Sequence, residues 1–189
     1  MPVKVHLDRL GVTFPTPNGA FRAVAPLDLR IESGRFVSLV GPSGCGKSTL
    51  FNVIAGLLQP TEGRVLIDNQ DATGTIGRVG YMLQKDLLLT WRSVLDNVML
   101  GRYSLYAGWF LAYGLRLPWT MRAERRHQGR AAEICDFIGI AAHLHKPAGV
   151  LSYGDQKRVD IARALAVEPT VLMLDEPAAG MNSSETAEM

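Results

Sequence analysis

Two short stretches of this 189-residue sequence carry side chains suited to phosphate chemistry. The first, Gly41 to Ser48 (GPSGCGKS), matches the pattern G-x-x-x-x-G-K-[ST]. Glycines allow successive backbone N–H groups to turn inward around phosphates, and a lysine ammonium can bridge the outer ones. The second stretch is Asp175-Glu176, a pair of carboxylates at the end of an apolar run. Together they indicate a site for a phosphorylated ligand.

The glycine-rich stretch offers backbone donors, one ammonium and hydroxyl groups. We expect Lys47 to contact the outer phosphates and Ser48 to hold Mg²⁺ through its hydroxyl. The predicted phosphate-binding residues are Gly41, Pro42, Ser43, Gly44, Cys45, Gly46, Lys47, Ser48 and Thr49. The alternative is a glycine-rich turn without a ligand. It is disfavoured because the flanking sequence predicts a buried strand before the loop and a helix after it.

A parallel sheet would bring both stretches to one edge. Phe36–Val40 is an almost continuous apolar run, typical of a buried parallel strand, and Lys47–Leu58 has apolar residues at helical spacing. Val171–Leu174 predicts a second buried strand, and ligands lie at the carboxyl ends of strands in open α/β sheets. We therefore expect Asp175 to bind Mg²⁺ indirectly, through water. Glu176 is expected to orient and partly deprotonate an attacking water.

The remaining pattern is β-rich in the first half and helical in the second. Short strands are predicted at residues 3–14, 27–31, 63–67 and 79–83. From Ser93, which forms a weak capping box with Asp96, helices are predicted to about Leu144, and a further helix at Val159–Val167. The basic segment Met121–Arg130 is interpreted as the solvated face of a helix.

Composition restricts the class of protein and the kind of partner. The chain is 47% hydrophobic and 20% charged, which is typical of one globular core, and its net charge of +2 is too small to indicate nucleic-acid binding. Two cysteines, Cys45 and Cys135, make a disulfide framework unlikely, and the N-terminus lacks a signal peptide. The apolar stretch Ser104–Trp119 is shorter than the roughly 20 residues of a membrane span. We expect membrane association only through a partner.

Between the two phosphate-linked stretches lies Leu151-Ser-Tyr-Gly-Asp-Gln156, which resembles the LSGGQ signature of the ABC ATPases. The resemblance covers practically the whole chain. It includes Gln84 after a strand, the acidic strand end at Glu176 and the D-loop-like segment Ala178–Asn182. It implies an α/β fold, a P-loop NTPase of the ABC type. Such a fold has a β-rich N-terminal subdomain, a parallel core sheet and a helical subdomain, here at about residues 93–158.

The resemblance also implies a head-to-tail dimer that shares its ATP sites. ATP and Mg²⁺ would lie between Lys47 of one subunit and the signature of the other. The signature residues implied to act in trans are Ser152, Tyr153, Gly154, Asp155 and Gln156. The implied catalytic residues are Glu176 and Gln84, and the implied metal ligands are Ser48, Gln84 and Asp175. Taken alone, a serine and a glycine before a helix are more often an N-cap and a turn.

Two further assignments come from the resemblance. Phe14 occupies the place of an aromatic residue that stacks on adenine in the family, and its alternative is a place in the core of a strand. The loop after Gln84 is apolar, and the family uses this region to form a groove for a coupling helix of the membrane subunit. An exposed Leu87–Trp91 would suit such an interface, whereas burial of these leucines in the core is the alternative.

The implied function is ATP binding and hydrolysis for an importer. The chain would be peripheral at the cytoplasmic face of the inner (plasma) membrane, bound to transmembrane permease subunits, with a solute-binding protein acting indirectly and no nucleic acid. Leu89–Val98 resembles ATPases of nitrate, sulfonate and taurine importers, with Thr90 replacing the usual proline. Ile161–Leu165 and the insertion at Gly101–Arg126 resemble ATPases of branched-chain amino acid importers. The sequence leaves open which solute is transported and whether the dimer is a homodimer or a heterodimer.

The C-terminus departs from the family pattern. The family continues beyond the D-loop to a switch histidine, whereas this sequence ends at Met189, and all four of its histidines precede the acidic strand end. The expectation is a nucleotide-binding domain over residues 1–189 without that C-terminal part, which argues against hydrolysis by this chain alone. The alternative function is a truncated, hydrolysis-deficient fragment that serves as a nucleotide-binding or interaction module. A soluble ATPase acting on nucleic acid or ribosomes is disfavoured, because no second phosphate loop or long coiled coil occurs.

Overall fold

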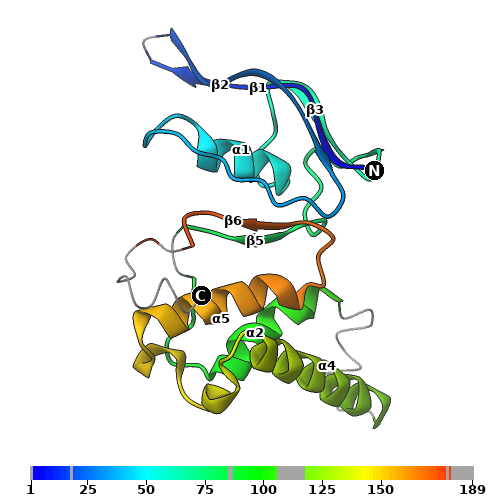
Figure 1. Ribbon diagram of the computed structural model, residues 1–189, viewed down its shortest axis with the longest axis vertical. Coiled ribbons are helices and arrows are strands. Elements are labelled where there is room, and N and C mark those ends of the chain that lie inside the picture. The colour runs from blue at the N-terminus through cyan, green and yellow to red at the C-terminus, as the bar shows by residue number, and fades with distance from the viewer. Residues whose placement is uncertain (1, 18, 85–86, 106–117, 178, 180–189) are drawn as a thin grey trace. The chain divides into compact units, whose positions relative to one another are not determined.

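The computed structural model describes residues 2–17, 19–84, 87–105, 118–177 and 179. It divides into two compact units, Met1–Val79 and Gly80–Met189, and each is described by itself (Figure 1).

The first unit is an antiparallel sheet with one helix beside it. β1 (Val3–Thr16) and β2 (Gly19–Glu32) form a hairpin, to which β3 (Glu62–Ile67) and β4 (Gln70–Asp71) add in the order β2-β1-β3-β4. Apolar side chains of β1 and β3 form its core: Val5, Leu7, Leu10, Val12, Val65 and Ile67 are buried. The predicted hairpin and third strand are confirmed, and both hairpin strands are longer than predicted.

The helix after the phosphate loop, α1 (Lys47–Ile54), begins where predicted and ends four residues early. Gly56 has a φ of 77°, a left-handed conformation in which glycine avoids a steric penalty. The N–H groups of Gly56 and Leu57 donate to the carbonyls of Val53 and Asn52 at 3.1 and 2.9 Å. This is a Schellman arrangement, which satisfies the last carbonyls of the helix. The predicted helix was too long because the apolar spacing continues to Leu58, and hydrophobic periodicity alone does not reveal that Gly56 ends the helix.

The prediction of a buried strand before the phosphate loop is wrong. Phe36–Val40 forms no strand there, and Phe36 and Val40 are 94% and 93% exposed. A doubly buried strand needs neighbours that pair its N–H and C=O groups. Within the described residues of this unit, the four strands pair with one another and none pairs with 36–40. An apolar run of this kind can form a buried strand only where other strands pair with it, and the described strands of this unit do not.

The second unit holds the parallel strands and most of the helices. β5 (Gly80–Met82) pairs in parallel with β6 (Leu172–Leu174), which confirms the strands predicted at 79–83 and 171–174. The helices α2 (Val94–Arg102), α4 (Pro118–Phe137) and α5 (Tyr153–Ala166) lie together on one side of this pair (Figure 1). Three 3-10 turns accompany them: η1 (Tyr103–Leu105), η2 (Ala141–His143) and η3 (Ala148–Val150).

Serine side chains begin two of these helices. Ser93 caps α2, because its Oγ accepts a hydrogen bond from Asp96 N at 3.1 Å, which confirms the predicted start of this helix. Ser152 caps α5 in the same way, accepting from Asp155 N at 3.1 Å. As a result α5 begins at Tyr153, six residues before the predicted start at Val159.

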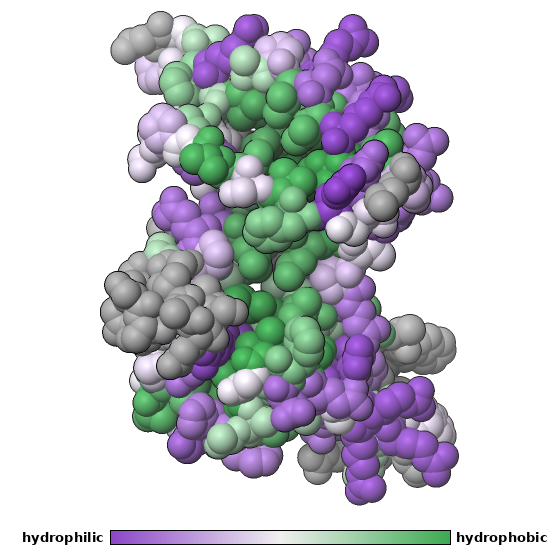
Figure 2. Space-filling view, viewed as in Figure 1, coloured by the Kyte–Doolittle hydropathy of each residue, from purple (hydrophilic) through white to green (hydrophobic). Residues whose placement is uncertain are grey.

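Packing of α2, α4 and α5 leaves a basic helix face in water. The apolar part of their shared core includes Val94, Val98, Ala131, Cys135 and Val159. Met121, Arg122, Arg125 and Arg126 of α4 are exposed, and Figure 2 shows hydrophilic side chains gathered over α4 at the lower right. The interpretation of 121–130 as a solvated face is confirmed. Among the described residues, no helix combines the length and the apolar content required to cross a bilayer.

A buried arginine joins the ends of α2 and α5 to the middle of α4. Arg102 donates from Nη1 to Ala166 O and to Glu168 Oε1, both at 3.1 Å, and from Nε to His127 Nδ1 at 3.0 Å. Burial, followed by the positive charges of Arg102 and Arg126, lowers the pKa of His127. The accepting nitrogen must be unprotonated for the contact with Arg102 to form.

Gly46 and Gly44 give a matched pair of substitutions in the phosphate loop. Their φ angles are 96° and 80°, so alanine at either position costs about 1–2 kcal/mol. A Cβ at Gly46 would also lie 2.5 Å from Ala23 O, whereas nothing lies within 4 Å of one at Gly44. We expect Gly46→Ala to lower the free energy of unfolding of residues 1–79 more than Gly44→Ala does, as measured by hydrogen exchange. Equal losses would mean that the loop moves off β2 at no cost.

The pH dependence of unfolding tests His127. Because its folded pKa lies below the unfolded value of about 6.5, the neutral ring stabilises the fold above pH 6.5. That contribution is lost as the pH falls from there toward the folded pKa. We expect His127→Gln, whose amide oxygen can still accept from Arg102, to show a smaller loss of stability on acidification. Urea unfolding on both sides of pH 6.5 measures this, with His145→Gln, an exposed histidine, as the control. The same pH slope in all three proteins would contradict it.

Candidate functional site

The lysine of the phosphate loop is held over the loop itself. Lys47 Nζ donates to Gly41 O at 2.8 Å and to Pro42 O at 2.9 Å, and it lies 3.8 Å from Cys45 Sγ. These carbonyls fix the ammonium at the mouth of the loop. An anion entering the loop therefore meets a positive charge that is already positioned.

Backbone donors complete the anion site. The N-cap of α1 is Gly46, which has no side chain to accept from the first turn. The N–H groups of the first turn have no acceptor within a helix, and the helix dipole adds positive character there. Lys47, Ser48 and Thr49 form that turn. The loop thus offers N–H donors, an ammonium and the Ser48 hydroxyl to one phosphate chain.

An exposed pair of aromatic rings lies near the loop. Phe14 on β1 is opposite Phe21 on β2, and the two are 37% and 56% exposed. The core alternative for Phe14 is therefore wrong. Because Gly46 packs against Ala23 O, the loop touches β2 two residues from Phe21, about 7 Å along the strand. Phe21 was missed by sequence reasoning, since its place depends on the register of the hairpin. Stacking of Phe14 on adenine stays a prediction.

The acidic strand end is built by β5 and β6. Asp175 is buried, and its N–H donates to Met82 O at 3.0 Å, which extends the parallel ladder. The Tyr81 hydroxyl donates to Asp175 Oδ2 at 3.4 Å. Burial and the charge of Asp175 raise the pKa of Tyr81 to about 12, so the phenol keeps its proton and remains a donor. The sequence did not indicate this contact, because Tyr81 and Asp175 are 94 residues apart.

The two predicted catalytic side chains are in direct contact. Gln84 Nε2 donates to Glu176 Oε2 at 2.8 Å. Glu176 has a φ of 52°, in the left-handed region that disfavours residues other than glycine. Its backbone therefore turns sharply at the end of β6, and the exposed carboxylate comes to lie beside Gln84. Such strain is common at functional sites.

The signature residues surround the beginning of α5. Ser152 is exposed, and its Oγ also donates to Asp155 Oδ2 at 3.0 Å, while Arg158 NH1 lies 3.3 Å from the other oxygen of Asp155. Gln156 Nε2 donates to Leu151 O at 3.0 Å. Asp155 and Gln156 are thus engaged within their own chain, Gly154 is buried, and Tyr153 lies under Lys157, whose Nζ is 5.2 Å from the ring centroid. Action of these residues in trans stays a prediction.

The predicted site residues divide between the units. The phosphate loop and Phe14 belong to the first unit, and Gln84, Asp175, Glu176 and the signature belong to the second. Of the D-loop-like segment 178–182 only Ala179 is among the described residues, and part of the 101–126 insertion, residues 106–117, also lies outside them.

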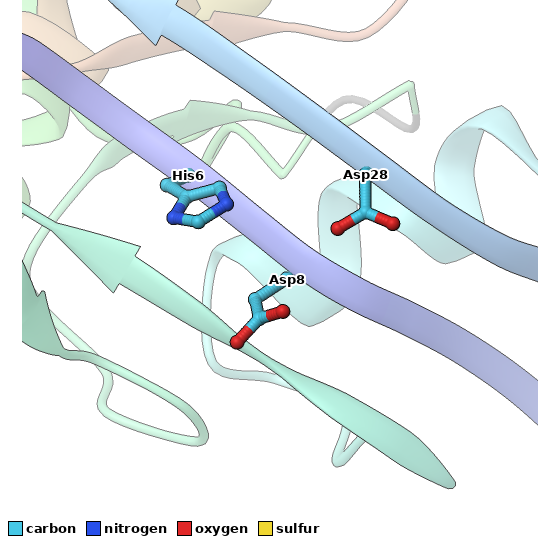
Figure 3. Close-up of side chains that lie close together, drawn as sticks. All are labelled: His6, Asp8 and Asp28. Carbon is cyan, nitrogen blue, oxygen red and sulfur yellow. The ribbon is translucent and has the colours of Figure 1, made fainter.

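His6, Asp8 and Asp28 form a separate cluster of potential metal ligands on β1 and β2 (Figure 3). One ligand atom from each lies within 4.8 Å of the others. Arginine side chains already contact His6 and Asp8, and an arginine backbone N–H contacts Asp28. Arg30 Nε donates to His6 Nε2 at 3.4 Å and Arg64 Nε donates to Asp8 Oδ2 at 3.0 Å, while Asp28 Oδ1 accepts from Arg9 N at 3.1 Å. These donors and charges explain the cluster as a polar network on the sheet, without a metal.

Known proteins are similar to this chain in sequence and in fold. The family model described as ABC transporter matches residues 24–179. The high-affinity branched-chain amino acid transport ATP-binding protein LivG of Escherichia coli (strain K12) is 36% identical over 177 residues, which cover 90% of this chain and 69% of LivG. The nitrate import ATP-binding protein NrtD of Synechococcus elongatus is 35% identical over 185 residues, which cover 98% of this chain and 63% of NrtD.

A solved structure agrees. The dimeric structure of MJ0796, a bacterial ABC transporter cassette, is similar with a TM-score of 0.79 and 30% identity, covering 97% of this chain and 78% of that one. Both importer types that the two halves of the sequence resemble are thus present among the relatives. Along the chain, the phosphate loop is followed by the signature and then by the acidic strand end, as predicted, on an α/β P-loop NTPase fold. The chain belongs to the ABC transporter family, as an ATP-binding ATPase of the importer type.

Proposed function

We propose that this chain powers an importer, in which closure of an ATP-bound dimer drives solute uptake through membrane subunits. The observation that carries the proposal is the 2.8 Å contact of Gln84 with Glu176 at the end of β6, because it joins a water-orienting amide to a general base. The relatives support the importer assignment, since LivG is a transport and NrtD an import ATP-binding protein. We further propose that residues 1–189 form one nucleotide-binding domain with its helical subdomain at about 93–158.

The donor set suits Mg²⁺ together with ATP. Ser48 supplies a hydroxyl, Asp175 a carboxylate and Gln84 an amide oxygen, and Mg²⁺ prefers oxygen ligands of this kind. The Gln84 amide nitrogen is engaged by Glu176, which leaves its oxygen for the metal. Bound Mg²⁺ would neutralise charge on the β- and γ-phosphates. Lys47 and the N–H groups of the first turn of α1 would bind the same phosphates, and Phe14 would stack on adenine.

Glu176 is suited to receive a proton from water. One of its carboxylate oxygens accepts from Gln84, and the other is left to accept from a water that attacks the γ-phosphate. The exposed position lets that water enter. Gln84 would orient the same water, so a change at either residue affects the chemical step.

The surface of the second unit suits two macromolecular partners. A second ATPase subunit would receive Ser152, which is exposed at the start of α5, and MJ0796 supports this arrangement because its structure is dimeric. Membrane permease subunits would bind the docking patch, which we define as Leu87, Trp91 and Val150. All three are exposed, Trp91 to 74%, and a hydrogen bond of 2.9 Å from Gly149 N to Thr90 O brings their segments together.

The docking patch is smaller than the apolar loop indicated. Leu88 and Leu89 are partly buried, and Leu88 packs against the core of the helices, so the core alternative is right for Leu88. A patch of a few exposed apolar side chains is still typical of an interface with a helix. Binding there would hold the chain at the cytoplasmic face of the membrane, with solute-binding protein linked through the permease.

Lys47→Ala tests nucleotide binding. Removal of the ammonium leaves phosphate charge uncompensated, and a charged hydrogen bond contributes about 1.5–3 kcal/mol, or roughly a ten- to hundredfold change in affinity. We expect the affinity for Mg-ATP to fall by that factor in isothermal titration. Lys146→Ala removes an exposed lysine of the second unit and serves as the control. Unchanged affinity in Lys47→Ala would refute the phosphate site.

Glu176→Gln tests the chemical step. The amide keeps the size of the side chain and cannot take a proton, so we expect ATP affinity to be retained and turnover to fall by about 10²–10⁴-fold. Phosphate release under saturating ATP measures turnover, and Glu124→Gln on the exposed face of α4 is the matched control. Turnover at the parent rate would remove Glu176 from catalysis. A parent chain that binds ATP without any turnover would favour the nucleotide-binding module instead.

A further inference from the structure

The loop after Gln84 is hydrogen-bonded to the segment that leads into the signature. Gly149 N donates to Thr90 O and Ala148 N donates to Arg92 O, both at 2.9 Å. The two backbones are in close contact, because a Cβ on Gly149 would lie 3.0 Å from both Cβ and O of Thr90. Residues 87–93 therefore have a fixed register against residues 146–149.

Only one turn separates this contact from Ser152. Ala148–Val150 form the 3-10 turn η3, in which Val150 N donates to Pro147 O and Leu151 N to Ala148 O, each at 3.3 Å. Ser152 follows directly as the cap of α5. A displacement of residues 148–149 would thus reach Ser152 through a short, hydrogen-bonded segment.

Asn97 holds the loop from inside. Its side chain is fully buried in α2, and its Oδ1 accepts from Leu89 N at 2.8 Å. Its Nδ2 donates to Leu89 O at 3.0 Å and to Ser93 O at 2.9 Å, with Arg92 O at 3.4 Å. One amide thus binds both backbone groups of Leu89 and the carbonyls at the end of the loop. No other side-chain type of this size has a donor and an acceptor in this arrangement.

The signature helix holds the same loop from the other end. Arg163 of α5 donates from NH1 to Leu87 O at 2.7 Å, while its NH2 is 2.5 Å from Asp160 Oδ1 on the same helix. Asp160 is buried, and its carboxylate fixes the direction of the guanidinium. The loop is therefore attached to α2, to α5 and to the signature segment at separate points.

We propose that Asn97 is a positioning residue that joins loop 87–93 and the signature segment into one rigid body and so sets the position of Ser152 in the ATP-bound dimer. This rests on the proposed function, because Ser152 is taken to act on the ATP of the partner subunit. Trp91 of the docking patch belongs to this body. A permease that moves Trp91 would then move Ser152 with it.

ATP-driven dimerisation tests the proposal. In the Glu176→Gln background, analytical ultracentrifugation with Mg-ATP gives the dimer dissociation constant, and titration gives ATP affinity. Asn97→Ala, which leaves Leu89 without its partners, is expected to weaken the dimer at least about fivefold, the range of coupling between distant sites. Asn97→Asp is expected to do the same, because a carboxylate keeps the shape but cannot donate to the carbonyls. ATP affinity should not change, since the phosphate loop belongs to the other unit.

A neighbouring residue separates positioning from stability. Val98 is the next residue of α2, is fully buried in the helical core and has no hydrogen-bonding group. Val98→Ala should lower the melting temperature and leave the dimer dissociation constant unchanged. Equal weakening by Val98→Ala, or dimers of Asn97→Ala and Asn97→Asp as tight as the parent, would overturn the proposal.

Hydrogen exchange gives a second measurement that does not depend on the dimer. The amides of Ala148 and Gly149 donate to the loop that Asn97 holds, so their exchange should accelerate in both Asn97 variants and not in Val98→Ala. If the Glu176→Gln parent binds ATP but stays monomeric, the proposed dimer function fails. The exchange result still decides the role of Asn97, and unchanged exchange at Ala148 and Gly149 would refute it.

Discussion

Three residue pairs between β5 and β6 determine how the side chains at the acidic strand end are arranged. Gly80, Tyr81 and Met82 lie opposite Leu172, Met173 and Leu174 in parallel register. Parallel strands end at the same edge, so the residues after Met82 and after Leu174 come together. The contacts of Gln84 with Glu176 and of Tyr81 with Asp175 both follow from that register. A shift of β5 by one residue would turn the side chains of that strand to the opposite face and separate Tyr81 from Asp175.

The first strand of this pair also depends on close packing against α5. A Cβ at Gly80 would lie 2.4 Å from Ala164 O, so only glycine allows β5 to approach the helix. Ile161 and Ala164 of the same helix pack against Met82. The signature helix is therefore a packing partner of the strand that leads to Gln84. The helix that follows the signature and the strand that leads to Gln84 thus share one small core.

Much of the site was predictable because its chemistry is written in contiguous residues. The glycine spacing from Gly41 to Ser48 predicted both the loop and the start of α1, and Ser93 predicted the start of α2. The strand prediction at Phe36–Val40 failed because an apolar run shows that a segment favours burial. It does not show which strands can pair with that segment. The predicted start of α5 at Val159 is too late because the apolar run VDIARALAV marks only the last part of a helix whose first turns, Tyr153–Arg158, are mostly polar.

Other parts could not be predicted, since they depend on register between distant segments. Asn97 has no distinguishing neighbours in the sequence, and its importance lies in the backbone groups that meet it after folding. The same holds for Tyr81 and for Phe21, whose partners are chosen by strand pairing.

The left-handed backbone at Glu176 sets stability against activity in a single residue. A glycine there would relax the chain by about 1–2 kcal/mol and would also remove the carboxylate. This strained backbone therefore accompanies the carboxylate that we propose for the chemical step. Under that proposal, a related sequence with glycine at this position would keep the fold and lose ATP turnover.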